Sequence, residues 1–71
     1  MEFTTEIIPI DGGDVTVHAF KRDGSSVWEF KILGGTQHGR LIQEWEDMDN
    51  TYVSRTDALA AAAKWIKRTL H

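Results

Sequence analysis

The alternation of apolar and polar residues along the first two thirds of the chain predicts short β-strands. The clearest case is the segment Val27–Leu33, where Trp28, Phe30 and Ile32 alternate with charged residues. A repeat of two places alternate side chains on opposite faces of a strand. We therefore expect this strand to turn one apolar face to a core and one charged face to water.

Two earlier segments predict a hairpin. Phe3–Ile10 is rich in Thr and Ile, which favour strands. Pro9 has no N–H for a ladder hydrogen bond, so this strand is expected at a sheet edge. Asp11-Gly12-Gly13-Asp14 is typical of a tight turn. A second strand, Val15–Arg22, is therefore expected to run antiparallel to the first.

The second strand has two unlike faces. Small apolar side chains occupy one of them: Val15, Val17 and Ala19. The other face carries Thr16, His18 and Phe20. Turn residues at 22–25 then lead into the third strand. We assign the second of these faces to solvent, but which face of the sheet the helix covers stays open, and this decides whether Phe20 is exposed.

The chain after the third strand is harder to assign. The glycine-rich residues 34–39 are expected to form a loop, and Arg40–Trp45 a fourth strand. In that strand Leu41 and Trp45 would share one face, with Ile42 on the other. The acidic residues 46–50 are expected to be an exposed connection, followed by a few extended residues at 51–53.

Ser54–Leu70 carries the strongest helical pattern in the chain. Ser54 and Asp57 have the spacing of a capping box, with Thr56 as an alternative N-cap. One apolar stripe follows helical spacing: Leu59, Ala62, Ala63, Ile66 and Leu70. The predicted fold class is α+β, a three- to four-stranded antiparallel β-meander with one C-terminal α-helix packed on one face, in a single domain over residues 1–71.

The composition fits one small globular domain of 71 residues with a net charge of −3 and no cysteine. The absence of cysteine excludes disulfides and thiolate metal sites. No apolar run reaches the roughly 20 residues of a membrane span, and the first residues lack the pattern of a secretory signal. We therefore expect a cytoplasmic protein with no membrane partner.

No candidate catalytic or metal site is evident in the sequence. Asp47 and Asp49 begin a weak likeness to a calcium loop that lacks its essential Gly and Glu. His18, His38 and His71 do not have the spacing of paired metal ligands. No serine lies in a Gly-x-Ser-x-Gly turn. We expect no cofactor, no metal and no enzymatic activity.

Two partner classes remain, and both point to the sheet. The leading hypothesis is a protein-interaction module, binding itself as a homodimer or another protein, with an apolar patch of Phe20, Val27 and Leu33 on the face opposite the helix. The alternative is weak binding of nucleic acid, which the acidic net charge opposes. The candidate partner-binding residues are His18, Phe20, Lys31 and Arg40.

Several short motifs are similar to those of known proteins. They are Val17-His18-Ala19, Asp23-Gly24 ahead of Trp28–Ile32, Ser54–Leu59 and Ala62–Ile66. With these the chain resembles a loose set of short, uncharacterised bacterial proteins that have a β-meander followed by one C-terminal helix. The resemblance implies that layout and a bacterial origin, and it carries no known activity.

Overall fold

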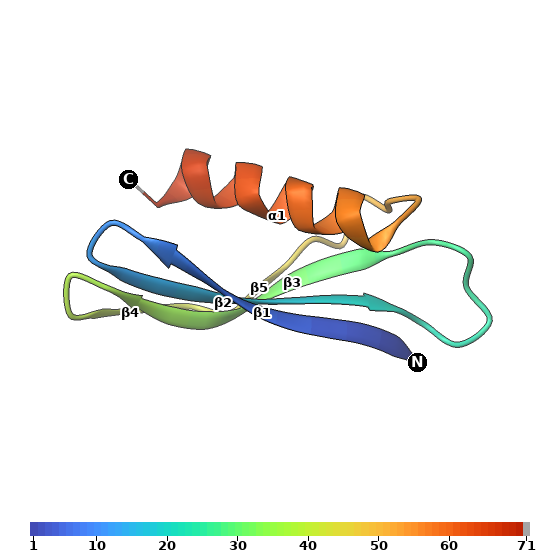
Figure 1. Ribbon diagram of the computed structural model, residues 1–71, viewed down its shortest axis with the longest axis horizontal. Helices are drawn as coiled ribbons and strands as arrows, with labels where there is room; N and C mark the ends of the chain where they lie inside the picture. The colour runs from blue at the N-terminus through green and yellow to red at the C-terminus, as the bar shows by residue number, and fades with distance from the viewer. Residues whose placement is uncertain (71) are drawn as a thin grey trace.

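The computed structural model describes residues 1–70 as two layers, a helix lying along one face of an antiparallel sheet (Figure 1). The strands are β1 (Glu2–Ile10), β2 (Gly13–Lys21), β3 (Glu29–Gln37), β4 (Arg40–Ile42) and β5 (Trp45–Glu46), and the helix is α1 (Arg55–Thr69). The sheet order is β1-β2-β3-β4, and β5 also pairs with β3. This confirms the predicted meander with one C-terminal helix.

The glycine-rich segment 34–39 is not a loop, so that prediction was wrong. β3 continues through Gln37, and the turn consists of His38 and Gly39 alone, between the paired residues Gln37 and Arg40. Both turn residues have positive φ, 51° and 77°, as a tight twisted hairpin requires. The third strand therefore begins later and ends later than its hydrophobic pattern suggested.

Two glycines allow the backbone in the middle of β3 to adopt an unusual conformation. Gly34 and Gly35 have φ values of 141° and 148°, which side chains other than glycine rarely adopt. A Cβ atom on Gly35 would lie 2.1 Å from the carbonyl oxygen of Asp14 on β2. The glycines are there because the backbones of two paired strands meet closely, not because the chain turns.

A β-bulge in β3 exchanges the two faces of the sheet partway along the strand. Val17 pairs with Ile32, but its neighbour Thr16 pairs with Gly34, so one residue of β3 is left over. Beyond the bulge, the alternation of inward and outward side chains has shifted by one position. Residues on either side of the bulge therefore cannot be assigned to a face by counting in twos.

The sequence pattern predicts that Leu41 and Trp45 share a face, and this prediction was wrong because of the bulge. Ile42 pairs with Gly35, and Trp45 pairs with Ile32. Both therefore point to the helix side, whereas Leu41 points to the opposite side and is exposed. Residues 43 and 44 interrupt the strand between them, which splits the predicted fourth strand into β4 and β5.

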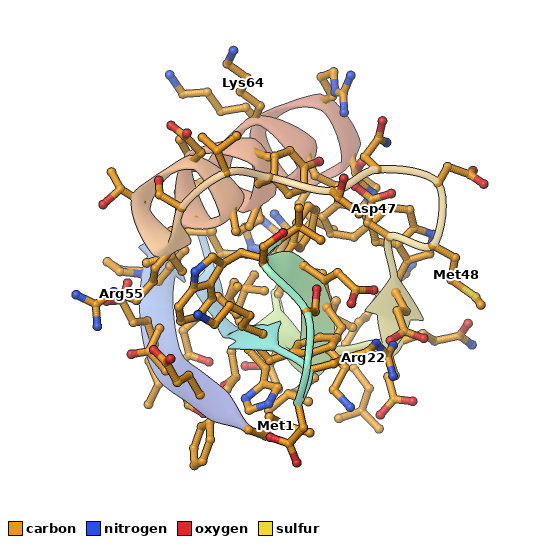
Figure 2. The ribbon with its side chains drawn as sticks, turned by 90° about the vertical axis from the view of Figure 1, so that its right-hand side faces the viewer. Met1, Arg22, Asp47, Met48, Arg55 and Lys64 are labelled. Atoms are coloured by element: carbon orange, nitrogen blue, oxygen red, sulfur yellow. The ribbon has the colours of Figure 1, made fainter. Side chains whose placement is uncertain are left out.

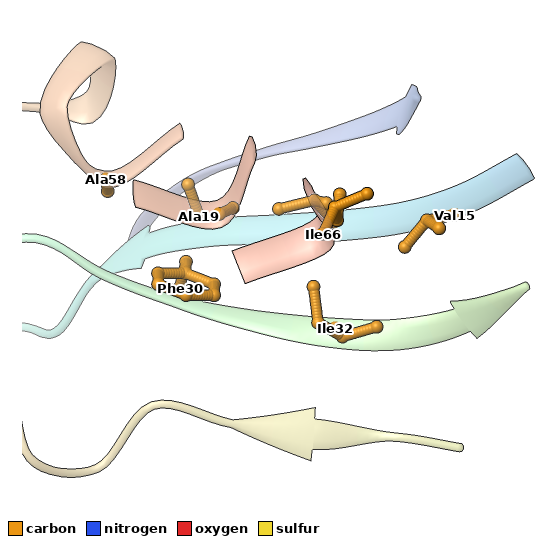
Figure 3. Packing of buried hydrophobic residues seen from close by; sticks show 8 residues of the cluster. Val15, Ala19, Phe30, Ile32, Ala58 and Ile66 are labelled. Carbon is orange, nitrogen blue, oxygen red and sulfur yellow. The ribbon is translucent and has the colours of Figure 1, made fainter. Parts of the chain in front are cut away.

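The core lies between α1 and the inner face of β2 and β3 (Figure 3). The sheet contributes Val15, Val17, Ala19, Phe30 and Ile32, and the helix contributes Ala58, Ala62 and Ile66. The buried stripe of α1 therefore follows a spacing of four residues. Ala63, which was predicted to belong to it, is exposed, while Leu59 and Leu70 flank it as partly buried residues.

The start of α1 is fixed as predicted. The Ser54 hydroxyl oxygen accepts a hydrogen bond from the backbone N–H of Asp57 at 3.1 Å. The backbone of Ser54 is extended, with φ at −147°. Ser54, and not Thr56, is thus the N-cap, and it satisfies one of the donors that a helix leaves free at its first turn.

The connection before α1 is held by a buried carboxylate. Asp47 is buried, against the expectation that 46–50 is exposed throughout. Its carboxylate accepts hydrogen bonds from the Tyr52 hydroxyl at 2.7 Å, the Asn50 amide at 3.1 Å and the Asp49 backbone N–H at 3.3 Å. Figure 2 shows Asp47 beneath this loop. Burial, together with the hydrogen bond to Asp47, raises the pKa of Tyr52 to about 12.

Tyr52 also joins the connection to the sheet. Its backbone exchanges two hydrogen bonds with Trp28, at 2.7 and 2.8 Å. Of the extended residues expected at 51–53, only Tyr52 pairs with the sheet, in this single bridge. Because Tyr52 is held by its backbone and its side chain together, the loop that carries Asp47 is fixed against the beginning of β3.

Candidate interaction surface

The face of the sheet opposite α1 is covered by no other element of the described chain (Figure 1). We call it the open face. Alternation along paired strands assigns its side chains. β1 contributes Phe3, Thr5 and Ile7, β2 contributes Thr16, His18 and Phe20, β3 contributes Glu29, Lys31 and Leu33, and β4 contributes Leu41.

Four large apolar side chains of the open face are exposed to solvent. The exposed fractions are 61% for Phe3, 68% for Ile7, 38% for Leu33 and 85% for Leu41. Single exposed apolar residues are common on protein surfaces, but a group on one face is a feature of interaction surfaces. On the inner face of the same sheet the apolar side chains are buried under α1. The open face therefore differs from it in leaving large apolar side chains exposed to water.

A row of three rings crosses β1 and β2 on this face. The centroid of the His18 ring lies 5.2 Å from that of Phe3 and 5.5 Å from that of Phe20. The Arg22 guanidinium and the Lys31 ammonium lie 5.2 and 5.9 Å from the centre of the Phe20 ring. These neighbours leave Phe20 only 4% exposed, so the expectation of an accessible Phe20 was wrong.

Arg22, one of the two cations beside Phe20, is already paired with acidic side chains. Arg22 contacts Glu29 at 2.8 Å and Glu46 at 3.7 Å. The hydrogen bond to Glu29 raises the pKa of Arg22 above its ordinary value. Figure 2 shows Arg22 at the side of the sheet. The pairing with two carboxylates makes Arg22 a poor ligand for an incoming phosphate.

His18 lies in the middle of the row of rings. Its surroundings disfavour the protonated, positively charged form of the imidazole. Its Nδ1 lies 3.0 Å from the Thr5 hydroxyl oxygen, and the two share a hydrogen bond. Burial, and then the nearby charge of Lys31, lowers the pKa of His18 below its ordinary value. The imidazole is therefore neutral at neutral pH and adds a ring, not a cation, to the open face.

The structure brings together three of the four candidate residues named from the sequence. His18, Phe20 and Lys31 are neighbours on the open face. Arg40 pairs with Gln37 at the far end of β3, where the bulge has turned it to the helix side. Sequence alternation could not place Arg40, because the shift depends on which residues of β2 pair with β3.

Two of the exposed apolar residues, Phe3 and Ile7, were missed by reasoning from the sequence. Their alternation with Thr and Glu was a usable signal, but it indicated only a strand at an edge. Val27, which was expected in the patch, precedes β3 and is half-buried in the loop, where its backbone N–H donates to the Ser25 hydroxyl at 3.2 Å. The apolar group of the open face thus lies nearer β1 than predicted.

A second concave surface lies between β4 and the end of α1. It is a cleft of about 650 Å³ whose apolar lining includes Ile42, Trp45, Trp65 and Leu70. The Trp45 and Trp65 rings are stacked, with centroids 5.0 Å apart and planes at 18°. Because each indole covers one face of the other, the pair fills space between β5 and α1 and closes the core at this end.

Comparison with known proteins adds no assignment. No family model, no curated protein and no solved structure matches the chain. Within residues 1–70, no group of three His, Asp or Glu side chains is placed to hold a metal ion. The helix in the described part of the chain lacks the length and apolar character needed to cross a membrane. The likeness to short bacterial proteins therefore stays a prediction from the sequence.

Proposed function

We propose that this chain is a protein-interaction module without catalytic activity, which binds another protein chain through the open face. The observation that carries the proposal is the group of exposed apolar side chains on that face, Phe3, Ile7, Leu33 and Leu41. Burying apolar area is the main source of affinity between proteins. A partner that covers this face would remove all four side chains from water at once.

The size of the open face supports the proposal. The molecule measures 39 × 19 × 18 Å, and the sheet runs along its longest dimension. One whole face is therefore comparable with the roughly 800 Å² that each partner contributes to a stable interface. A small domain can gain in this way the buried area that its own core does not provide.

A comparison of two lysine variants tests the proposal. Leu33→Lys/Leu41→Lys places two charges on the open face. Met48→Lys/Val53→Lys adds the same charge at residues that are each 81% exposed and lie in the connection before α1. Immobilised wild-type protein and the control variant should retain the same binding protein from a cell extract, and the face variant should lose it.

Circular dichroism must first show that the wild type, the face variant and the control variant are equally folded. Retention of the same proteins by all three would contradict the proposal, as would retention of nothing. Proteins lost equally from both variants would show a general effect of charge, and would also count against the open face.

A weak nucleic-acid-binding activity is the second candidate. The observation that favours it is the exposed Phe3 ring beside His18, with Lys31 close by, since bases stack on such rings and cations meet phosphates. The net charge of −3 and the paired state of Arg22 oppose it. Titration with a single-stranded oligonucleotide at about 50 mM salt tests it, because phosphate contacts are strong there. A lack of binding would exclude this function.

The proposal includes the cytoplasmic location and the bacterial origin expected from the sequence. Both rest on the sequence pattern alone. Fractionation of cells that express the chain would check the location, since an interaction module of the cytoplasm should be recovered in the fraction that also holds its partner.

A further inference from the structure

Among residues 1–70 no strand pairs with the outer edge of β1, and the hairpin to β2 fixes which of its backbone groups point outward. Ile10 and Gly13 face each other across a two-residue turn, and the carbonyl of Gly12 accepts from His38 on the β3 side. In an antiparallel ladder, bonded residues alternate along the strand. Ile10 and every second residue before it therefore bond to β2. The N–H and C=O groups of the residues between them point outward, at Phe3, Thr5 and Ile7.

This edge has only part of the usual protection against strand addition, namely the charged residues Glu2 and Glu6 and the proline Pro9. β1 has nine residues, and Thr5, Glu6 and Ile7 in its middle are all exposed. Natural edges are commonly shortened, bulged or interrupted by proline. Here Pro9 lies at the far end of the strand and the register with β2 is regular throughout. A second strand can therefore pair along most of β1.

We propose that β1 pairs antiparallel with β1 of a second copy of this chain, about a two-fold axis at Thr5. The proposal goes beyond the proposed function, because it concerns the backbone edge of β1 and a second copy of the chain, whereas the open face is proposed to bind another protein. Phe3 of one copy then lies opposite Ile7 of the other on the open face. Thr5 faces Thr5, and the outward N–H and C=O groups of all three residues are paired.

Charge and proline select this register over its neighbours. With the axis at Thr5, Glu6 lies opposite Thr4 and Glu2 opposite Ile8 of the second copy, so no two acids face each other. An axis at Glu6 would set Glu6 against Glu6, and Phe3 against Pro9, which has no N–H to give. An axis at Thr4 would set Glu2 against Glu6. Like charges directly opposite each other destabilise a strand pair, so both alternatives are disfavoured.

The pairing also joins the exposed apolar residues of two copies. Phe3 and Ile7 are the most exposed apolar side chains of β1 on the open face. On each side of the axis, Phe3 of one copy lies opposite Ile7 of the other, so the pairing forms two apolar cross-strand pairs with the Thr5 pair between them. The result is one continuous sheet through both copies, with the two α1 helices on the same side of it. The dimer thereby buries the edge of β1 that is exposed to solvent in the monomer.

Substitution at Thr5 tests the pairing through the backbone. Thr5→Pro removes the N–H that points outward and none that β1 gives to β2, so the fold of one chain should be kept. Thr5→Ala removes the hydroxyl and keeps the N–H. By light scattering after size exclusion, wild-type protein and Thr5→Ala should have twice the monomer mass of 8.1 kDa. Thr5→Pro should have 8.1 kDa, with unchanged circular dichroism.

Disulfide formation tests the register without relying on Thr5→Pro to fold. The chain contains no cysteine, and residues in a bonded antiparallel pair have Cα atoms about 5.5 Å apart, within the range of a disulfide. Thr5→Cys should form a covalent dimer on mild oxidation. Thr51→Cys, an exposed threonine in the connection before α1, is the matched control and should stay largely monomeric.

A monomeric wild-type protein at every soluble concentration would overturn the inference, and so would equal crosslinking of Thr5→Cys and Thr51→Cys. A dimer that persists in Thr5→Pro would also overturn it. None of these results decides the proposed function, because the capture experiment varies Leu33 and Leu41 on β3 and β4, away from this edge. A monomer that still loses its partner in the face variant would reject the edge pairing alone.

Discussion

Asp47 is the one polar or charged residue that is buried among residues 1–70. A buried carboxylate is tolerated when several donors satisfy its oxygens. Asp47 has three of them, from Tyr52, Asn50 and the backbone of Asp49. Its own backbone N–H donates to the carbonyl of Phe30 on β3 at 3.3 Å. A single residue thus ties the connection before α1 to the sheet.

Removal of the Tyr52 hydroxyl should destabilise the domain. A hydrogen bond to a charged group is worth about 1.5–3 kcal/mol, so Tyr52→Phe should lower the free energy of unfolding by about that amount in urea denaturation. In an Asp47→Asn background the same substitution should cost less, because the acceptor is no longer charged. Equal losses in both backgrounds would show that the tyrosine ring, and not its bond to Asp47, matters.

The raised pKa of Tyr52 predicts a loss of stability in alkali. The folded value is about 12, against 10.0 for the free side chain. The unfolded chain therefore releases this proton first, so the stabilisation is complete below pH 10 and is lost as the pH rises from 10 to 12. Between these values wild-type protein should lose more stability than Tyr52→Phe in thermal unfolding.

Direct titration checks the same value. Tyr52 is the only tyrosine of the chain, so the ultraviolet absorbance of tyrosinate reports this residue alone. The midpoint should lie near pH 12 in the wild type and move toward 10 in Asp47→Asn. A midpoint near 10 in both proteins would mean that the hydroxyl is not held by Asp47 in solution.

At the scale of elements, the packing of α1 depends on small residues at every fourth position. Ala58 and Ala62 have no exposed surface, and Ile66 follows them toward the end of the helix. Figure 3 shows Ala58 and Ile66 directed at the side chains of β2 and β3. Because alanine lacks bulk, the first turns of the helix can lie close to the sheet.

Two leucine substitutions distinguish the observed stripe from the one expected from periodicity. Ala62→Leu should overfill the closed space under the helix and cost about 1–3 kcal/mol. Ala63→Leu adds the same atoms at an exposed position and should change stability by less than about 0.5 kcal/mol. Urea denaturation of both variants provides the measurement. Equal losses would mean that the helix is rotated about its axis from the position described.

Local features of the elements were predictable, and features that depend on pairing were not. The Asp11-Gly12 turn and the Ser54 cap are set by residues within a few positions of each other, so their sequence patterns were sufficient. The faces of β4 depend on a bulge that arises where β3 meets β2. Gly34 and Gly35 resemble a loop in sequence, because glycine occurs both in turns and at close strand contacts.

The same distinction applies to the candidate site. The grouping of His18, Phe20 and Lys31 followed from alternation within two strands. The burial of Phe20 depends on Arg22, whose guanidinium lies over the ring and is paired with Glu29. The burial of Asp47 required Tyr52 to be brought beside it by a bridge to Trp28. Contacts between distant segments decided both cases, and no local pattern encodes them.

At the scale of the whole molecule, the two faces of the sheet have different roles. One is closed by α1 and holds the fold together, and the other presents apolar residues without a cover. The chain carries a net charge of −3, so two copies repel each other at long range. Any self-association must therefore come from short-range contacts, such as paired backbone groups and apolar side chains.

The response to salt should separate the two proposed partner classes. Added salt screens repulsion between acidic copies, so the dissociation constant of the homodimer should fall as salt rises from about 10 to 150 mM. Binding to nucleic acid would weaken over the same range, because it depends on phosphate contacts. Analytical ultracentrifugation at several salt concentrations checks the first. A dimer that dissociates on adding salt would contradict association through uncharged contacts.

The stacked Trp45 and Trp65 rings give the fold a built-in optical signal. They belong to β5 and α1 and meet only when the helix is docked. Two indoles in such contact couple their electronic transitions and quench each other's emission, whereas Trp28 lies just before β3 in a bridge with Tyr52, outside the pair. Rapid-mixing fluorescence of Trp28→Phe would follow the pair alone. The moment at which the helix closes over the sheet during refolding can thus be timed without an added label.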